Sequence, residues 1–307
     1  MLSLAKDFDK SEFSGLELIG KGAFAHVFKT YNNHLKATIV LKILPKAKID
    51  EKTVLTEVSA LNHLRGRCAD GILCYIDFRQ DPRNYYVITE YLGDFVTLEK
   101  YGESQIVPEA LAKIIENMKN GLIVCHEAGI AHRDIKPANI MINPKTLDTK
   151  YLDFGLSCRL DTCYMRVSLG TPAYAGPESM GIIGTIPDTL GKWYRFDLWS
   201  LGMVIMYLLL REDFIDFYGM EHMGKIPIDL IELTNVYEHM YENGGMSDKL
   251  LKEICDKYYH GTHEYLSTSV LPMVHMLNER RNMYVDKNAS ISNPDFEKVE
   301  ITLTNYW

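Results

Sequence analysis

The first part of the chain alternates between short apolar runs and turn residues. β-Branched and aromatic residues form three runs between residues 16 and 44, separated by a glycine-rich turn and by Asn32-Asn33. Runs of this composition, bounded by turn residues, predict β-strands. Similar runs at 71–78 and 85–89 predict two more strands. The chain therefore begins with a strand-rich unit.

One stretch within this unit, residues 50–64, has the period of a helix instead. Val54, Val58 and Leu61 recur on one helical face, and Glu57 lies at the margin of that face. Asp50 is a suitable N-cap, because its carboxylate can accept a hydrogen bond from a backbone amide of the first turn. The pattern predicts a helix that packs on the strands.

Further along the chain, the pattern becomes mainly helical. Residues 108–129 begin with a proline, end with a glycine and carry an apolar face, which predicts a long amphipathic helix. Residues 197–210 are apolar on every face, which predicts a helix buried inside the protein. A short strand is expected at 149–152. The apolar face of the first helix comprises Leu111, Ile114, Ile115, Met118, Leu122 and Cys125.

Composition and charge narrow the kind of protein. With 307 residues, 47% hydrophobic and 24% charged, the chain can build one large domain or two lobes. A formal net charge of −8 provides no basic surface, so no nucleic-acid partner is expected. The start is charged where a secretion signal needs an apolar run, and the longest apolar stretch, 198–210, is too short to span a bilayer. We expect a cytoplasmic or nuclear protein with no membrane contact.

The six cysteines show neither CxxC spacing nor a matched histidine pattern for zinc. Reduced thiols in an intracellular protein are the simplest interpretation. The cysteines are Cys68, Cys74, Cys125, Cys158, Cys163 and Cys255.

The richest cluster of chemical groups is the stretch HRDIKPAN at 132–139. Asp134, Lys136 and Asn139 place a carboxylate, an ammonium and a carboxamide close together. Pro137 disfavours helical geometry at the preceding residue and removes a backbone donor. The stretch is expected to be a rigid loop that presents its side chains rather than burying them. A solvated polar turn is the alternative interpretation.

Lys42 lies inside the apolar strand that also contains Val40 and shares a face with it. A buried ammonium costs several kcal/mol unless it is paired. Glu57, on the helix that follows, is the natural counter-ion. The alternatives are an edge strand that lets Lys42 reach water and an ordinary surface glutamate at position 57.

Taken with the DFG sequence at 153–155 and the glycine pattern at 20–25, these residues resemble the eukaryotic-type protein kinase family. The glycine pattern alone is weak and equally suits a plain hairpin. The resemblance implies an α+β, two-lobed kinase fold: a small β-rich N-lobe over 1–92 with one main helix, and a larger helical C-lobe over 93–307. It extends well from Phe13 to Leu210 and poorly beyond.

The resemblance also implies roles for the residues of the catalytic loop and the metal site. Asp134 would accept or orient the proton of the attacking hydroxyl, and Lys136 would neutralise charge on the moving phosphoryl group. Asn139 and Asp153 would hold Mg²⁺, with Mn²⁺ as a possible substitute, and Gly155 would permit the turn that aims Asp153. Thr171 would bond near Asp134 and Lys136; its alternative is an ordinary turn threonine.

For the nucleotide, the resemblance implies that Lys42, held by Glu57, grips the phosphates of ATP. Small residues of the glycine loop would let backbone amides approach a phosphate, and Thr89 would guard the back of the adenine pocket. The predicted nucleotide-binding residues are Ile19, Gly20, Gly22, Ala25, Val27, Val40, Lys42, Thr89, Glu90, Leu92 and Met141.

The implied activity is transfer of the ATP γ-phosphate to serine or threonine hydroxyls of a protein substrate, because Lys136 and Thr171 follow the serine/threonine variant of the motifs. The alternatives are a catalytically weak or inactive kinase-fold scaffold and a small-molecule phosphotransferase. Oligomeric state, substrate and the need for phosphorylation in the activation segment stay open. So do the roles of 179–196 and 211–270, and which of Arg280 and Arg281 pairs with Glu178.

Overall fold

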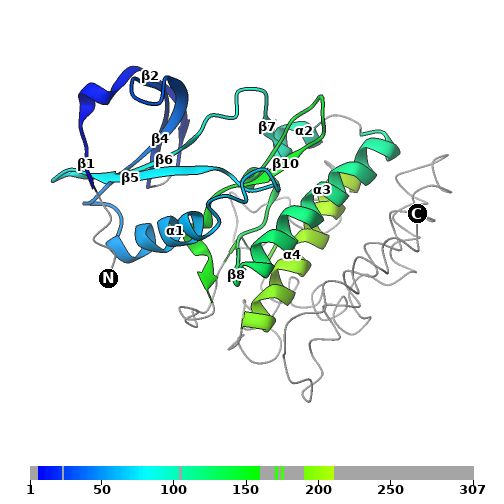
Figure 1. The fold of residues 1–307 in the computed structure, drawn as a ribbon. Coiled ribbons are helices and arrows are strands. Elements are labelled where there is room, and N and C mark those ends of the chain that lie inside the picture. The colour runs from blue at the N-terminus through cyan, green and yellow to red at the C-terminus, as the bar shows by residue number, and fades with distance from the viewer. Residues whose placement is uncertain are drawn as a thin grey trace, which may run out of the picture.

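A strand-rich part and a helical part make up the fold (Figure 1). The protein is represented by a computed structural model, which describes residues 6–22, 24–103, 106–159, 170–171, 174–175 and 190–210.

The strand-rich part is one six-stranded sheet in the order β1-β5-β6-β4-β3-β2. β1 runs parallel to β5, and the other neighbours are antiparallel. The predicted strands are confirmed, while β1 was not predicted, because two residues carry no readable alternation. The strands are β1 Lys6–Asp7, β2 Phe13–Lys21, β3 His26–Asn32, β4 Ala37–Pro45, β5 Tyr75–Gln80 and β6 Asn84–Glu90, with a 3₁₀ turn, η1, at Lys10–Glu12.

The two faces of this sheet have different roles. Alternation along β4 places Ile39 and Leu41 on one face, where they form a small cluster with Tyr86 and Ile88. Val40 and Lys42 fall on the opposite face, the one that packs against the following helix. β4 has a neighbour on each side, so the edge-strand alternative for Lys42 is wrong. Lys42 therefore points into the protein.

Helix α1, Glu51–His63, begins and ends as its sequence predicts. Asp50 is the N-cap, and its carboxylate accepts a hydrogen bond of 2.9 Å from the Thr53 amide. Val54, Val58 and Leu61 are buried. Glu57 is buried as well, rather than standing at the margin, because it turns towards the sheet to meet Lys42.

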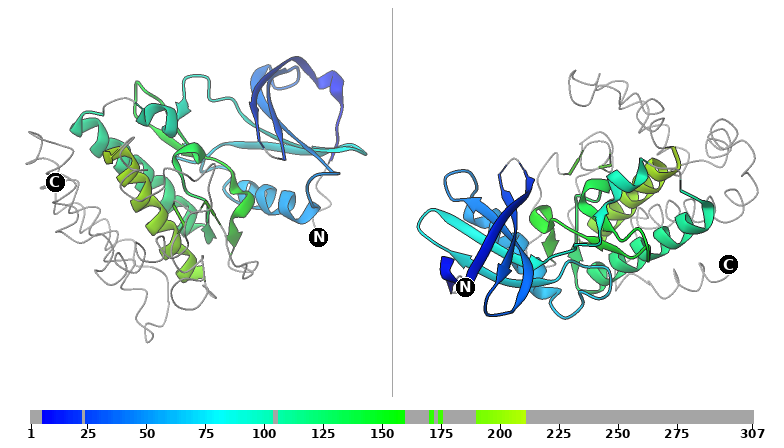
Figure 2. Two further views of the ribbon diagram at one scale, coloured as in Figure 1. Left: turned by 180° about the vertical axis from the view of Figure 1, so that it is seen from behind. Right: turned by 90° about the horizontal axis from the view of Figure 1, so that it is seen from above.

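Two long helices, α3 and α4, lie side by side in the helical part, as the views in Figures 1 and 2 agree. The six apolar residues predicted for α3 are all buried. Two small sheets, β10-β9-β7 and β11-β8, lie beside these helices. The elements are β7 Val96–Thr97, α2 Leu98–Gly102, α3 Pro108–Glu127, β8 Ile130–Ala131, η2 Pro137–Asn139, β9 Ile140–Ile142, β10 Thr149–Tyr151, η3 Phe154–Leu156, β11 Cys158–Arg159 and α4 Leu190–Leu210.

Helix α4 is longer than its sequence suggested, because it begins at Leu190 rather than at 197. The helix thus takes in the end of the segment 179–196, whose role the sequence leaves open, including Gly191. One glycine near a helix end costs only about 1 kcal/mol, which the packing of the following apolar run outweighs. Within the described ranges, no helix combines the length and the apolar character needed to cross a membrane.

The prediction that all cysteines are reduced is wrong. Cys68 and Cys74 form a disulfide, with their Cα atoms 4.8 Å apart. Cys158 is also disulfide-bonded, whereas Cys125 is a free, buried thiol. Spacing alone did not reveal the first pair, because the loop between α1 and β5 must fold back before the two residues meet.

That loop lies directly against α3 at a pair of glycines. Gly71 has a φ of +89°, and a Cβ added to it would lie 2.9 Å from the Cα of Gly121. Any side chain at position 71 would therefore push the loop away from the helix.

We predict that Gly71→Ala destabilises the protein more than Gly66→Ala does. Both glycines have positive φ, so each alanine costs about 1–2 kcal/mol in backbone strain. A Cβ at position 66 has no atom within 4 Å, whereas a Cβ at position 71 meets the α3 backbone. The overlap should cost about 1–3 kcal/mol more, measured by urea denaturation. Equal losses for the two variants would contradict the close contact.

Candidate functional site

The HRDIKPAN loop is held from beneath by a single carboxylate. Asp197 of α4 is fully buried, and it accepts hydrogen bonds of 2.7 Å from the backbone amides of both His132 and Arg133. His126 of α3 lies 2.9 Å from the same carboxylate. The loop prediction is confirmed, but the expected exposure is wrong for much of the loop: His132, Arg133, Asp134 and Asn139 are all buried. Their burial follows from these bonds, which draw the loop onto α4.

Around Asp134, four side chains form a closed hydrogen-bonded group. Thr171 Oγ1 donates to Asp134 Oδ1 over 2.8 Å, and Lys136 Nζ donates to Thr171 Oγ1 over 2.7 Å. Lys136 Nζ also lies 2.9 Å from Asp134 Oδ2, which accepts from Asn139 Nδ2 over 2.9 Å. The structure thus brings together four of the predicted site residues, and Thr171 is no ordinary turn threonine.

Gly170 allows Thr171 to reach this group. Its φ is +84°, and a Cβ on it would lie 2.8 Å from the carbonyl oxygen of Arg133. Only glycine fits so close to the loop without moving it. The backbone of residue 170 therefore passes directly against the backbone of the HRDIKPAN loop, which places the Thr171 hydroxyl next to Asp134.

Lys42 connects the sheet to helix α1 and to Asp153. Its Nζ lies 2.6 Å from Glu57 Oε1 of α1 and 3.4 Å from Asp153 Oδ1. The Lys42 and Glu57 side chains are 22% and 7% exposed, whereas that of Asp153 is 50% exposed. The predicted Lys42–Glu57 pair is confirmed, and the surface-glutamate alternative is wrong. One carboxylate is buried and holds the lysine, while the other is open to solvent.

Burial and charge act in opposite directions on these three groups. Burial lowers the pKa of Lys42, but the Glu57 and Asp153 carboxylates raise it further, so the ammonium stays charged. Burial raises the pKa of Glu57 above its ordinary value, despite the opposing charge of Lys42. Burial also raises the pKa of Asp153, but Lys42 and His132 outweigh this effect and hold it below its ordinary range. Asp153 is thus an ionised, accessible carboxylate.

The backbone turn that aims Asp153 is made by Asp153 itself. Its φ of 56° is in the left-handed region, whereas Gly155 has no positive φ. The expectation that Gly155 permits the turn is therefore wrong. Gly155 matters for space instead, because a Cβ there would lie 3.3 Å from Asp153 Oδ1. A left-handed aspartate is strained, and such strain is common where a side chain must be aimed.

Several predicted nucleotide-binding residues share the sheet face of Lys42. Val27 of β3 is the cross-strand partner of Lys42, and Thr89 of β6 is the partner of Val40. Cross-strand partners point to the same face, so these side chains form one continuous surface. Val27 and Val40 are half-buried, as is Met141 on β9.

The glycine turn between β2 and β3 lies at the end of this surface. Gly20 pairs with Val27, and the Gly22 amide donates to the carbonyl of Ala25 over 2.9 Å. Ile19 is 44% exposed at a bulge in β2. The turn is a hairpin, as both interpretations require, and it borders the face that carries Lys42.

At the end of β6 and just after it, some backbone groups already make hydrogen bonds and others do not. The Glu90 amide donates to the Cys74 carbonyl over 3.0 Å, and the Leu92 carbonyl accepts from Phe95 over 3.1 Å. Within the described part of the chain, the Leu92 amide has no hydrogen-bond partner. Glu90 and Leu92 are both predicted nucleotide-binding residues. Of their two backbone amides, that of Glu90 already donates a hydrogen bond, whereas that of Leu92 is available.

The family of protein kinase domains matches residues 13–279 of this chain. This span is well over half of its length. The chain belongs to the protein kinase family. The loop, the lysine–glutamate pair and the DFG aspartate therefore occupy a kinase fold.

Several protein kinases share modest sequence identity with this chain. Myosin light chain kinase A of Dictyostelium discoideum is 29% identical over 248 residues, which is 78% of this chain and 79% of the relative. CBL-interacting protein kinase 10 of Oryza sativa subsp. japonica is 28% identical over 256 residues, 78% of this chain and 52% of the relative. Calcium-dependent protein kinase 4 of Plasmodium berghei is 28% identical over 208 residues, 65% of this chain and only 37% of the relative. The kinase therefore spans part of the length of two of these three proteins.

The donor set near Asp153 suits a hard divalent cation. Asp153 offers carboxylate oxygens, and Asn139, whose amide nitrogen is bonded to Asp134, is left with its carbonyl oxygen. Mg²⁺ prefers oxygen ligands, and usually takes one or two from the protein and the rest from water and phosphates. Among the described residues, no three carboxylates, cysteines or histidines gather in one place. Asp153 and Asn139 thus provide two oxygen donors of the kind that magnesium prefers.

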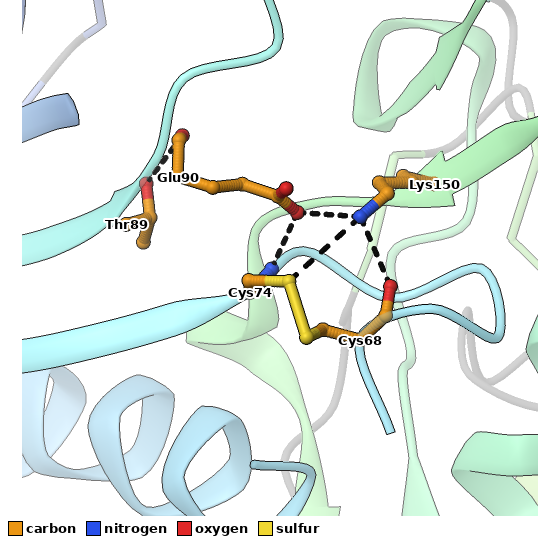
Figure 3. Close-up of a disulfide and its surroundings, with 5 residues drawn as sticks. All are labelled: Cys68, Cys74, Thr89, Glu90 and Lys150. Carbon is orange, nitrogen blue, oxygen red and sulfur yellow. Dashed lines mark hydrogen bonds and ion pairs between the residues drawn. A yellow bond between two sulfur atoms is a disulfide. The ribbon is translucent and has the colours of Figure 1, made fainter. Parts of the chain in front are cut away.

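Two contributors to the site were not predicted. His126 packs beneath the loop against Asp197, and Lys150 of β10 reaches the Glu90 side chain (Figure 3). Lys150 stands between the buried Thr149 and Tyr151, and a charged residue between buried neighbours was the available signal. For His126, the sequence offered no such signal apart from its position near the end of a helix.

Some predicted features lie outside the described residues. They are the Glu178 partner among Arg280 and Arg281, Gly176 where the resemblance implies an alanine, Thr162 and Ser168 as the candidate phosphorylation sites in the activation segment that follows Asp153, and the segment 211–270.

We predict that Lys42→Met lowers the free energy of unfolding by about 3 kcal/mol near neutral pH, because it leaves Glu57 buried without its counter-ion. The folded-state pKa of Glu57 then rises further above its unfolded value. A group with a raised pKa stabilises the fold at low pH and loses that contribution as pH rises. The loss should therefore shrink between about pH 7.5 and about pH 5, as measured by urea denaturation.

The control is the double variant Lys42→Met/Glu57→Gln, which has no carboxylate at position 57. The decrease in its free energy of unfolding should vary less with pH than the decrease caused by Lys42→Met alone. If Lys42→Met lowers the free energy of unfolding by the same amount at both pH values, Glu57 is not an unpaired charge in that variant.

Proposed function

We propose that this chain transfers the γ-phosphate of ATP to serine or threonine hydroxyls of protein substrates, with magnesium. The observation that carries the proposal is the closed group of Asp134, Lys136, Thr171 and Asn139, with the Lys42–Glu57 pair formed nearby. Both are organised in one structure, as phosphoryl transfer requires.

Asp134 has room for one more hydrogen bond. A carboxylate offers about four acceptor sites, and here Thr171, Lys136 and Asn139 occupy three of them. The remaining site suits the hydroxyl of an incoming serine or threonine, whose proton Asp134 would orient and accept. The three existing bonds fix the carboxylate, so little reorganisation is needed.

Lys136 supports the same step by charge. Its ammonium is held by Thr171 and Asp134, which leaves the third N–H free to face a phosphoryl oxygen. Placed there, it would neutralise charge that builds up on the transferred group. Lys136 and Thr171 also carry the assignment to serine and threonine, because their contact with Asp134 is the serine/threonine arrangement.

The nucleotide would lie against the sheet face that carries Lys42. Lys42 would grip the α- and β-phosphates, and the glycine turn at Gly20 and Gly22 would cover them. The adenine would lie between Val40 and Met141, with the Leu92 amide as a donor and Thr89 behind. Ile19, Ala25, Val27 and the Glu90 carbonyl complete the proposed contacts.

Asp153 and Asn139 would hold Mg²⁺, or Mn²⁺ in its place. The bound ion supplies positive charge that neutralises the phosphates. Asp153 suits this task because its carboxylate is half-exposed and its pKa is depressed, even though burial alone would raise it. It therefore stays ionised at neutral pH.

We further propose a domain boundary between residues 92 and 93, just after the adenine-side segment. A protein substrate and ATP are the proposed partners, and no nucleic-acid or membrane partner is proposed. We propose the cytoplasm or the nucleus as its location.

A radiolabelled-ATP assay should show label on the protein itself or on a generic protein substrate, and phosphoamino-acid analysis should find phosphoserine or phosphothreonine. Asp153→Ala should abolish transfer, because it removes a metal ligand. Label on small alcohols alone would indicate a small-molecule phosphotransferase. Nucleotide binding without any transfer would indicate a scaffold.

We predict that Asp134→Asn lowers kcat by about 10²–10⁴-fold, because proton transfer is lost only in the transition state. The Kd for ATP should stay within about threefold of wild type, since Asp134 does not hold the nucleotide in the ground state. The matched control is Asp148→Asn, an exposed acid in the turn between β9 and β10. Wild-type turnover in the Asp134 variant would remove Asp134 from the mechanism.

A further inference from the structure

The disulfide-closed loop lies between α1 and β5 and contacts the strand that leads to Asp153. Cys68 and Cys74 are six positions apart in sequence. Between them, the Gly71 carbonyl accepts from the Tyr151 amide over 2.8 Å, and the Leu73 amide donates to the Tyr151 carbonyl over 3.2 Å. The loop therefore adds a short backbone pairing to β10, two residues before Asp153.

Cys74 is bonded to Glu90 through both of its backbone groups. Its carbonyl accepts from the Glu90 amide over 3.0 Å, and its amide donates to Glu90 Oε1 over 2.8 Å. Figure 3 shows the Glu90 side chain extended from its strand towards the disulfide. One residue of the disulfide thus holds the backbone and the side chain of the segment proposed to bind adenine.

Lys150 closes the arrangement from the opposite side (Figure 3). Its Nζ donates to Glu90 Oε1 over 2.6 Å and to the Cys68 carbonyl over 2.9 Å. The Lys150 side chain is only 14% exposed, so these charge-assisted bonds are partly shielded from water. Both cysteines, Glu90 and Lys150 therefore form one connected group, which we call the disulfide clamp.

We propose that the disulfide clamp is a redox-sensitive control of the nucleotide site. This inference rests on the proposed function, because the Glu90 carbonyl is one of the proposed nucleotide contacts and Lys150 lies three residues before Asp153. When the disulfide is intact, the clamp holds both segments in the geometry that binds nucleotide. When it is reduced, the loop gains conformational freedom, and its hold on Glu90 and Lys150 weakens.

The chemical step is thiol–disulfide exchange with a dithiol reductant. The reductant is oxidised to its own disulfide, the Cys68–Cys74 bond breaks, and each cysteine sulfur takes up one electron and one proton to become a thiol. Both cysteines are half-buried, and Cys68 lies between the exposed residues Arg67 and Ala69, so a small reductant can reach the disulfide from that side.

The first test needs no nucleotide. Amide hydrogen exchange is compared for the oxidised and the dithiothreitol-reduced protein, with the redox state of Cys68 and Cys74 verified by alkylation and mass spectrometry. Reduction should speed exchange at least about fivefold in peptides that cover 88–92 and 149–152, because the clamp no longer restricts their opening. Unchanged exchange in both peptides, with the pair fully reduced, would overturn the proposal.

The second test measures the Kd of magnesium–ATP by direct binding. Reduction should weaken binding about fivefold or more, in line with ordinary coupling between two sites. The matched control is Cys68→Ser/Cys74→Ser, which should bind like the reduced wild type and should not respond to the reductant. A response of equal size in this variant would assign the effect to the Cys158 disulfide or another thiol, and would overturn the proposal.

The outcomes separate this proposal from the proposed function. If exchange changes but the Kd does not, the clamp is not coupled to the nucleotide site, and the proposal is overturned. If neither redox state binds magnesium–ATP, the proposed function fails. Hydrogen exchange then decides on the clamp: reduction must speed exchange in the wild type and must have no effect on exchange in the double serine variant. If both states bind alike and exchange is unchanged, only the clamp fails.

Discussion

The candidate site depends on the hydrogen bonds that the buried Asp197 carboxylate accepts. This carboxylate accepts hydrogen bonds from two consecutive amides, those of His132 and Arg133, and so replaces backbone partners that a tight loop cannot supply for itself. Arg133 is held with a φ of 66°, an uncommon conformation that such bonds can enforce. Because the loop cannot shift on α4, Asp134 is presented at one fixed place.

A second constraint links the two parts of the fold through charge. Lys42 comes from the sheet, Glu57 from α1 and Asp153 from the segment after β10, and their charges meet within hydrogen-bonding distance. The buried Glu57 carboxylate is tolerated only because Lys42 compensates it, and the pair is correctly placed only when α1 lies against the sheet. The charge balance of the site therefore depends on how α1 packs against the sheet.

The loop after α1 connects these groups to the segment that is proposed to bind adenine. Gly71 lets the loop approach α3 closely, and the loop backbone then pairs with Tyr151. The same loop bonds Glu90, while Lys150 joins Glu90 to the disulfide. α1, the segment after β6 and the strand before Asp153 are thus connected by one short stretch of chain. A covalent bond in that stretch can influence all three.

Local patterns in the sequence determined the strands and the helices α1 and α3, because alternation, helical period and capping act over a few neighbouring residues. The same reasoning required a partner for Lys42 and identified Glu57 as that partner. The candidate residues around Asp134 followed from the HRDIKPAN stretch and from the family resemblance that it carries. The tertiary structure alone decided that the HRDIKPAN loop is buried, that Asp153 itself makes the left-handed turn, and that Lys150 reaches Glu90. These outcomes depend on contacts between distant segments, such as the 60 positions that separate Glu90 from Lys150, and no local period records them. The disulfide belongs with them, since only the folding back of the loop brings Cys68 to Cys74.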